Sequence, residues 1–131
     1  MGEIYCSPAA VNSTGMPAEI GASGSASASA GDLVLEARSV PDQFGLFFHG
    51  ADRAQIPFGN GFLCATGDIV RGAPVHALDG SASYAYDNSD AKHSVLAFVG
   101  ATRHFQFWFR DPLAGGARFN TSDAIPIVIL P

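Results

Sequence analysis

The sequence predicts a single all-β domain over residues 1–131, an antiparallel β-sandwich of the jelly-roll or immunoglobulin-like kind with about eight or nine strands. An alternating aromatic segment at 103–110 is the strongest sign of a strand. Fifteen glycines and eight prolines are spread along the chain, which suits short strands joined by turns. No stretch keeps helical periodicity for longer than about two turns, so we expect little helix.

The segment 103–110 alternates phenylalanine with polar or amphipathic residues. The phenylalanines are Phe105, Phe107 and Phe109. Because successive side chains of a strand point to opposite faces, we expect these three rings to be buried in the core. Gln106 and Arg110 share the other face with Trp108, and we expect both to be substantially more exposed. The strand ends before Pro112, since proline cannot donate to a sheet ladder.

The first part of the chain predicts a hairpin and a buried strand. Alternating serine and alanine over residues 20–30 favour a half-buried strand over a flexible linker. The segment 32–39 continues as a strand, and the turn signal at Gly31 suggests that the two form a hairpin. Its inward residues are Leu33, Leu35 and Ala37. The dense aromatic segment 44–49 indicates a strand buried on both faces.

The middle of the chain predicts a long loop and short strands. Glycine, proline and asparagine over residues 50–61 indicate a loop. Short strands are expected at 62–64 and 68–71. Another strand is expected at 81–87, where Tyr84 and Tyr86 fall on one face.

The end of the chain predicts two turns and a closing strand. A glycine- and alanine-rich loop follows the aromatic strand at 113–117. One short helical turn, capped by Asn120 or Thr121, is predicted at 119–124. The apolar segment 125–130 is expected to close the domain as a strand.

Composition excludes several classes of partner. The net charge of −5 argues against nucleic acid and against anionic membrane surfaces. No apolar run approaches the roughly 20 residues of a membrane span, so no membrane insertion is expected. The start of the chain shows no signal peptide, and Met1-Gly2 could be a cloning remnant on a fragment of a longer protein.

Two cysteines suggest an extracellular domain. We expect Cys6 and Cys64 to form a disulfide, which closes a loop of about 58 residues and contributes roughly 4 kcal/mol. The alternative is two buried free thiols. Without a matching histidine spacing, the pair does not predict a zinc site.

No catalytic or metal motif stands out, and we expect a protein that is not an enzyme and has no metal centre. The four histidines show no paired spacing, although His49 and His104 sit at strand ends and could meet. There is no Gly-x-Ser-x-Gly elbow, and no two carboxylates are marked as a pair. The weak exception is a calcium-friendly loop with oxygen ligands on Asp87, Asn88 and Asp90. A polar hairpin tip with Asx-turns is the favoured alternative for that loop.

Aromatic residues are the candidate ligand-binding groups. Trp108, Tyr84 and Tyr86 could form a flat platform for stacking on sugar rings, or could instead be covered by a loop. Asp111 is expected to form a structural ion pair or turn clamp with Arg110. The glycosylation sequons at Asn12 and Asn120 are expected to be turn caps.

Several blocks of the chain resemble one family. They include Tyr5-Cys6, Gly59-Asn60-Gly61-Phe62-Leu63-Cys64, Phe107-Trp108-Phe109-Arg110-Asp111 and Phe119-Asn120-Thr121-Ser122-Asp123. These blocks resemble an uncharacterised all-β domain at the C-terminal ends of large secreted proteins of planctomycetes and myxobacteria. The resemblance implies a secreted bacterial accessory domain with no assigned reaction. Some members have a cysteine just before the last proline, where this chain has Leu130.

The leading functional hypothesis is a non-catalytic extracellular module that binds a polysaccharide or another cell-surface component. The first alternative is a self-assembling structural subunit of a filament or surface layer, suggested by low charge and the apolar segment 125–130. The second alternative is a small hydrolase or metalloenzyme.

Overall fold

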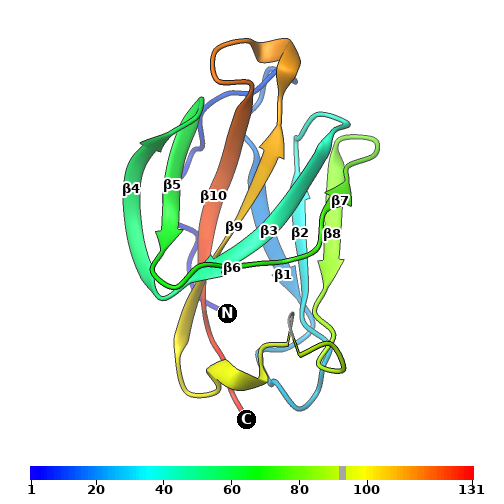
Figure 1. Ribbon diagram of the computed structural model, residues 1–131, viewed down its shortest axis with the longest axis vertical. Coiled ribbons are helices and arrows are strands. Elements are labelled where there is room, and N and C mark those ends of the chain that lie inside the picture. Colours follow the sequence, from blue (N-terminus) through cyan, green and yellow to red (C-terminus); the bar gives the residue numbers. More distant parts are fainter. Residues whose placement is uncertain (92–93) are drawn as a thin grey trace.

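A computed structural model describes residues 1–91 and 94–131 and confirms an antiparallel all-β sandwich (Figure 1). The described residues form ten strands, slightly more than the sequence predicts. They are β1 (Glu19–Ser23), β2 (Val34–Arg38), β3 (Phe44–Gly50), β4 (Asp52–Phe58), β5 (Gly61–Thr66), β6 (Val70–Arg71), β7 (Val75–His76), β8 (Ser81–Ala85), β9 (Thr102–Arg110) and β10 (Phe119–Val128). Two short 3₁₀ helices, η1 (Leu96–Phe98) and η2 (Pro112–Ala114), lie in the connections. None of the helices in the described part of the chain is long and apolar enough to cross a membrane.

The strands form two packed sheets and a separate hairpin. The larger sheet has the order β10-β9-β3-β6, and β7 also pairs with β3. The smaller sheet has the order β1-β2-β8. The hairpin of β4 and β5 lies at the edge of the molecule beside β10 (Figure 1).

The core lies between the two sheets and confirms the aromatic pattern of β9. Phe105, Phe107 and Phe109 are fully buried there. Phe47 of β3 packs on Phe107 with ring centroids 4.5 Å apart. The predicted inward residues are also buried, with Leu35 and Ala37 in β2 of the smaller sheet and Leu33 just before it. The predicted hairpin is also confirmed, since β1 and β2 pair antiparallel.

The other face of β9 is covered rather than open to solvent. The prediction that Gln106 is exposed is wrong, because its side chain is fully buried under β5. Arg110, which lies beyond the hairpin, is exposed as predicted. A third layer therefore covers part of the large sheet, and alternation along one strand does not reveal such a layer.

The segment 50–61 is a strand and a tight turn rather than a loop. Asp52–Phe58 forms β4, and Phe58 pairs with Gly61 across a two-residue turn. Gly59 has a positive φ of 60° and lies against the Phe119 ring, where a Cβ would be 2.3 Å from a ring carbon. Pro57 is tolerated because β4 is an edge strand that pairs with β5 alone.

The serine- and alanine-rich segment is a strand only in part. β1 ends at Ser23, so the predicted continuation to residue 30 is wrong. Gly24 turns the chain with a positive φ, and the Asp32 carboxylate accepts hydrogen bonds from the backbone N–H and hydroxyl of Ser25. Ala28 beyond the turn is buried, so this segment is not a flexible linker either.

The predicted helical turn at 119–124 is wrong, because these residues belong to β10. The pairing with β9 shifts register between Thr121 and Ala124. At this bulge the Ser122 hydroxyl accepts a hydrogen bond from the Phe107 N–H, 2.9 Å away. A side chain thus takes the place of a backbone partner, and the turn-like composition reflects a bulge. Further along, the apolar end of the chain lies in the core, with Ile125, Ile127 and Ile129 buried.

A disulfide joins Cys6 to Cys64, as predicted. The two Cα atoms are 6.4 Å apart, within the range of ordinary disulfides. Tyr5 also exchanges backbone hydrogen bonds with Ala124 of β10. The N-terminal segment is therefore attached to β5 and β10 together.

Phe107→Ala should destabilise the domain by about 3–5 kcal/mol, because it removes a ring at the centre of the core. Urea unfolding would measure the loss. Leu113→Ala is the matched control, since Leu113 is 87% exposed and its truncation should change stability by less than about 0.5 kcal/mol. A Phe107→Ala protein as stable as the control would contradict this placement of the core.

Candidate functional site

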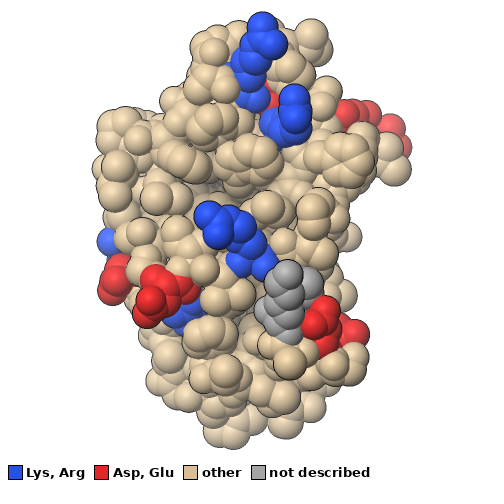
Figure 2. Space-filling model, in the orientation of Figure 1, with Lys and Arg blue, Asp and Glu red and all other residues tan. Residues whose placement is uncertain are grey.

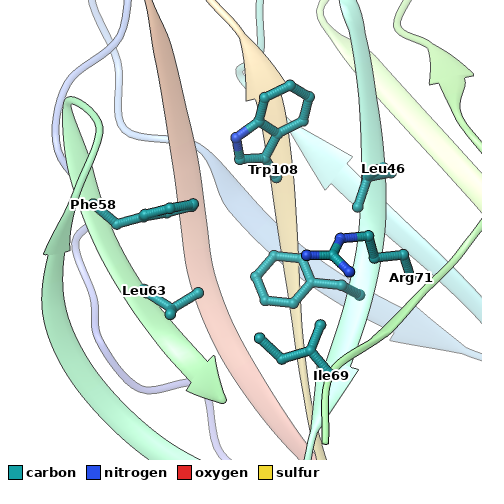
Figure 3. Close-up of a pocket in the computed structure, with 7 residues that line it drawn as sticks. Leu46, Phe58, Leu63, Ile69, Arg71 and Trp108 are labelled. Carbon is teal, nitrogen blue, oxygen red and sulfur yellow. The ribbon is translucent and has the colours of Figure 1, made fainter. Parts of the chain in front are cut away.

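A groove of about 410 Å³ lies on the outer face of the large sheet (Figure 3). Seven residues line it: Leu46, Phe48, Phe58, Leu63, Ile69, Arg71 and Trp108. Six of them carry apolar or aromatic side chains, and Arg71 is the charged member. Figure 3 shows the hairpin residues Phe58 and Leu63 on one side, with Ile69 and Arg71 on the other.

Strand register explains the floor of the groove. Leu46 of β3 pairs with Trp108 of β9, and Phe48 pairs with Gln106. These residues share the face opposite the core, because each neighbours a core phenylalanine in its strand. Phe48 is buried and Trp108 is partly buried, so the floor is apolar and the indole remains accessible.

A row of three aromatic rings joins the floor to the hairpin. The ring centroids of Trp108 and Phe119 are 5.8 Å apart, and those of Phe119 and Phe58 are 5.0 Å apart. Phe119 therefore supports both the indole and the hairpin. Such offset and edge-to-face contacts stabilise aromatic pairs beyond the burial of area.

The buried amide of Gln106 fixes the hairpin over the sheet. Its Oε1 accepts a hydrogen bond from the Cys64 N–H at 2.9 Å. Its Nε2 donates to the carbonyl oxygens of Phe62 at 2.9 Å and of Ser122 at 2.7 Å. The Thr121 hydroxyl also donates to the Phe62 carbonyl, at 2.6 Å. Side chains of β9 and β10 thus hold β5 in place where no backbone ladder joins them.

The hairpin has further anchors at its tip and at Cys64. At the tip, the Asn60 side chain donates to the Gly115 carbonyl and accepts from the Ala117 N–H. At Cys64, whose N–H is bonded to Gln106, the Tyr5 hydroxyl donates to the carbonyl at 2.8 Å, next to the disulfide. The wall of the groove is consequently held at its tip and in the middle of β5.

Two arginines lie on the face of the groove although the chain is acidic. Arg71 of β6 pairs with Phe48 and lies on the groove face. Arg110 pairs with Phe119, and cross-strand partners project to the same face, so Arg110 emerges beside the aromatic row. Figure 2 shows the largest Lys and Arg patches along the middle and top of this face, with the Asp and Glu patches nearer its edges.

The structure does not join Tyr84 and Tyr86 to Trp108 in one platform. Tyr86 is buried in the core, where its ring meets Phe105 at 5.7 Å, and Tyr84 packs near Phe47 at 6.5 Å. Both tyrosines therefore lie on the core side of the large sheet, while Trp108 lies on its outer side. The predicted three-residue platform is wrong as a single surface.

The histidines at the strand ends do not meet. His49 lies on the core face, where its Nδ1 accepts a hydrogen bond from the Arg103 Nε at 2.9 Å. Burial, together with the Arg103 charge, lowers the pKa of His49 to about 3. His104 lies on the outer face and shares a 2.9 Å hydrogen bond with the Tyr5 hydroxyl. Its pKa is also lowered, mainly by burial, and His93 lies outside the described residues.

The loop proposed for calcium uses its oxygens in local contacts. Asp87 Oδ1 accepts a hydrogen bond from the Ser89 N–H at 2.8 Å, which is the predicted Asx-turn. The Asn88 side chain donates to the Ala28 carbonyl and accepts from the Ser94 hydroxyl. Asp90 donates its N–H to the Asp87 carbonyl. Within residues 1–91 and 94–131, no three His, Cys, Asp or Glu side chains gather as a metal site.

Other predicted polar contacts find different partners. Asp111 is buried and accepts a hydrogen bond from the Ser13 N–H, so it clamps the N-terminal loop rather than pairing with exposed Arg110. Asn12 accepts hydrogen bonds from Thr14, which confirms its role as a turn cap. Asn120 lies in β10, where its side chain donates to the Ala10 carbonyl instead of capping a turn.

The sequence predicts Trp108 as a ligand-binding residue, but it does not predict the residues that form the walls of the groove. The sequence predicts a loop at Phe58 and short strands at Leu63, Ile69 and Arg71, with no site role for any of the four. The dipeptide Gly59-Asn60, which lies between Phe58 and Gly61, is a known hairpin signal and could have revealed the first wall. No local signal places Arg71 beside Trp108, because the two are brought together by strand pairing through β3.

Gln106→Leu should destabilise the domain by at least about 2 kcal/mol, because it keeps most of the side-chain volume but removes the partner of the buried Cys64 N–H and of the Ser122 carbonyl. Urea unfolding would measure this loss, and Trp108 emission should shift to the red as the hairpin loosens. Exposed Gln55 gives the control, since Gln55→Leu should leave both quantities almost unchanged. Wild-type stability and emission in Gln106→Leu would refute the anchoring role.

The stability of the domain should fall as the pH is lowered from about 6.5 towards 3. In this range unfolded His49 takes up a proton that the native histidine, with a pKa of about 3, does not. The loss contributed by His49 is at most about 1.4 kcal/mol per pH unit. His49→Gln should flatten the pH dependence measured by thermal unfolding, whereas Gln55→Leu, at an exposed position without a titratable group, should not. Equal slopes in both variants would disprove the assignment.

Comparisons with protein-family models, with curated proteins and with solved structures find no match for this chain. The resemblance to the secreted accessory domain therefore stays a prediction, and the groove itself is the basis for a functional proposal.

Proposed function

We propose that this domain is a non-catalytic attachment module that binds its partner through the groove around Trp108. The observation that carries the proposal is a preformed apolar groove in which the chain's one tryptophan is partly exposed. Its volume of about 410 Å³ is in the range of ligand sites, which are mostly apolar with a few polar groups.

The roles of nearby polar groups support binding rather than catalysis. The side chains of Gln106 and Thr121, which lie under the hairpin, form hydrogen bonds with backbone groups of β5 and β10. The Tyr5 hydroxyl is bonded to a carbonyl and to His104, and burial raises its pKa to about 12. These groups are positioned to hold the groove together, and none of the seven described lining residues is a serine, cysteine, histidine, aspartate or glutamate.

The lining favours a protein partner. Energetically dominant residues of protein interfaces are enriched in tryptophan and arginine, and they lie in apolar pockets. Trp108 and Arg71 occupy one such pocket together with Phe58. A sugar ligand would need several hydroxyl partners, whereas six of the seven lining side chains are apolar or aromatic.

Attachment outside the cell remains part of the proposal. The disulfide between Cys6 and Cys64 supports an oxidising compartment, because such bonds are rare in the cytosol. We propose a module of a secreted bacterial protein, as the family resemblance implies.

Polysaccharide binding is the second candidate. The accessible Trp108 indole favours it, since sugar rings stack on aromatic faces. The self-assembling alternative loses one of its motives, because Ile125, Ile127 and Ile129 are buried in the core rather than free to pair between chains.

Trp108→Ala should abolish ligand binding while the domain stays folded. A displayed library of random peptides and a panel of soluble polysaccharides would be screened against the wild type, with binding monitored by tryptophan emission. Leu78→Ala is the control, since Leu78 is 65% exposed and lies outside the groove. Ligands that bind Trp108→Ala as well as the wild type would overturn the groove as the site, and binding of sugars alone would favour the second candidate.

A further inference from the structure

The groove face carries two positive side chains, whereas the chain as a whole has a negative net charge. The formal net charge is −5, yet Arg71 and Arg110 both emerge on the groove face. Within the described part of the chain, neither guanidinium has an ion pair, a hydrogen bond or a ring contact. The groove therefore offers two cationic groups to a ligand.

The remaining described arginines, apart from Arg118, already have partners. Arg38 pairs with Glu19 at 3.8 Å, and Arg53 lies 3.9 Å above the Tyr5 ring. Arg103 is buried on His49 and is the arginine whose charge interacts with Asp68 and Asp52.

The two free guanidinium groups are separated by a defined span. Arg71 lies level with Gln106 across β3, two strands away from β9. Arg110 lies four residues further along β9 than Gln106. With about 3.4 Å per residue and about 4.8 Å between strands, the two Cα atoms are roughly 17 Å apart. Trp108 lies between these two levels, over the apolar floor.

This spacing matches an extended peptide. Alternate side chains of an extended chain share a face, and residues i and i+4 are about 13–14 Å apart. The arginine Cα atoms are a few ångströms further apart than residues i and i+4 of the peptide, and the long glutamate and arginine side chains span this difference. A carboxylate at i would meet one arginine, a carboxylate at i+4 would meet the other, and the side chain at i+2 would enter the apolar groove beside Trp108.

We propose that the groove binds an extended acidic segment of a partner protein with the pattern acidic–x–apolar–x–acidic. The proposal rests on the function proposed above and adds the chemistry and register of its partner. Charge complementarity selects an acidic segment, and the apolar floor selects the central residue.

Two peptides of identical composition test the register. One is acetyl-Ser-Glu-Ser-Leu-Ser-Glu-Ser-amide, which places both carboxylates on the same face as leucine when extended. The other is acetyl-Ser-Ser-Glu-Leu-Glu-Ser-Ser-amide, which places them on the opposite face. An array would expand each peptide into a set in which the central residue is leucine, isoleucine, valine or phenylalanine. A third set would repeat the first with glutamine in place of both glutamates. Trp108 emission and calorimetry would measure the affinities.

The first peptide set should bind about tenfold more tightly than the permuted and glutamine sets, since each exposed ion pair contributes about threefold. Arg71→Gln and Arg110→Gln should each lower its affinity about threefold, and added salt should have a similar effect. Arg38→Gln, on the other sheet, is the matched control and should change the affinity less than about twofold.

Each other result contradicts the proposal in a different way. Equal affinity for all three sets would overturn the acidic register and leave the attachment function standing. Binding of polysaccharides with no peptide binding would overturn the peptide and favour the second candidate. Concentration-dependent association of the domain, lost in Trp108→Ala, would show that a second copy of the chain fills the groove. No ligand from any class would overturn the attachment function as well.

Discussion

The buried amide of Gln106 is the interaction on which the outer face of this domain depends. It is bonded to β5 and β10 at once, while its own strand, β9, runs through the centre of the large sheet. Hydrogen bonds of buried groups contribute modestly when made and are costly when missing. The hairpin can therefore lie over the sheet only in the register in which Gln106 is satisfied, and this register sets the width of the groove.

One face of β9 packs in the core between the two sheets, and its other face packs under the β4–β5 hairpin and lines the groove. Its phenylalanines fill the core, and the alternate positions carry the amide that holds the hairpin and the indole of the groove. Close packing on the outer side needs small residues. A Cβ on Gly61 would lie 2.2 Å from the Asn120 side chain, so glycine lets β5 approach β10. Fold stability and the candidate site consequently depend on the same strand. Substitutions in β9 should therefore be poorly tolerated on both of its faces.

The sequence predicted what depends on local alternation. The buried phenylalanines, the inward residues of β2 and the hairpin of β1 with β2 all follow from a period of two. The failures occur where a distant segment decides the outcome. Alternation places Gln106 on the outer face but cannot show that β5 covers that face. Pro57 and three nearby glycines are typical of a loop, and so the sequence did not indicate β4. The polar residues at 119–123 are typical of a turn, but they form a bulged strand in which the Ser122 side chain takes the place of a backbone hydrogen-bond partner. In the groove, Trp108 stood out as the only tryptophan, whereas Arg71 joined it solely through strand pairing.

The contacts that fasten the β4–β5 hairpin affect the kinetics of recognition. Asn60 holds the tip, and Gln106 and the Cys6–Cys64 bond together hold the middle of β5. A wall held in this way stands open before any partner arrives, so binding needs no prior conformational step and loses little backbone entropy on the domain's side. Association should then depend on encounter and charge steering alone, and differences in affinity between partners should appear mainly as differences in residence time.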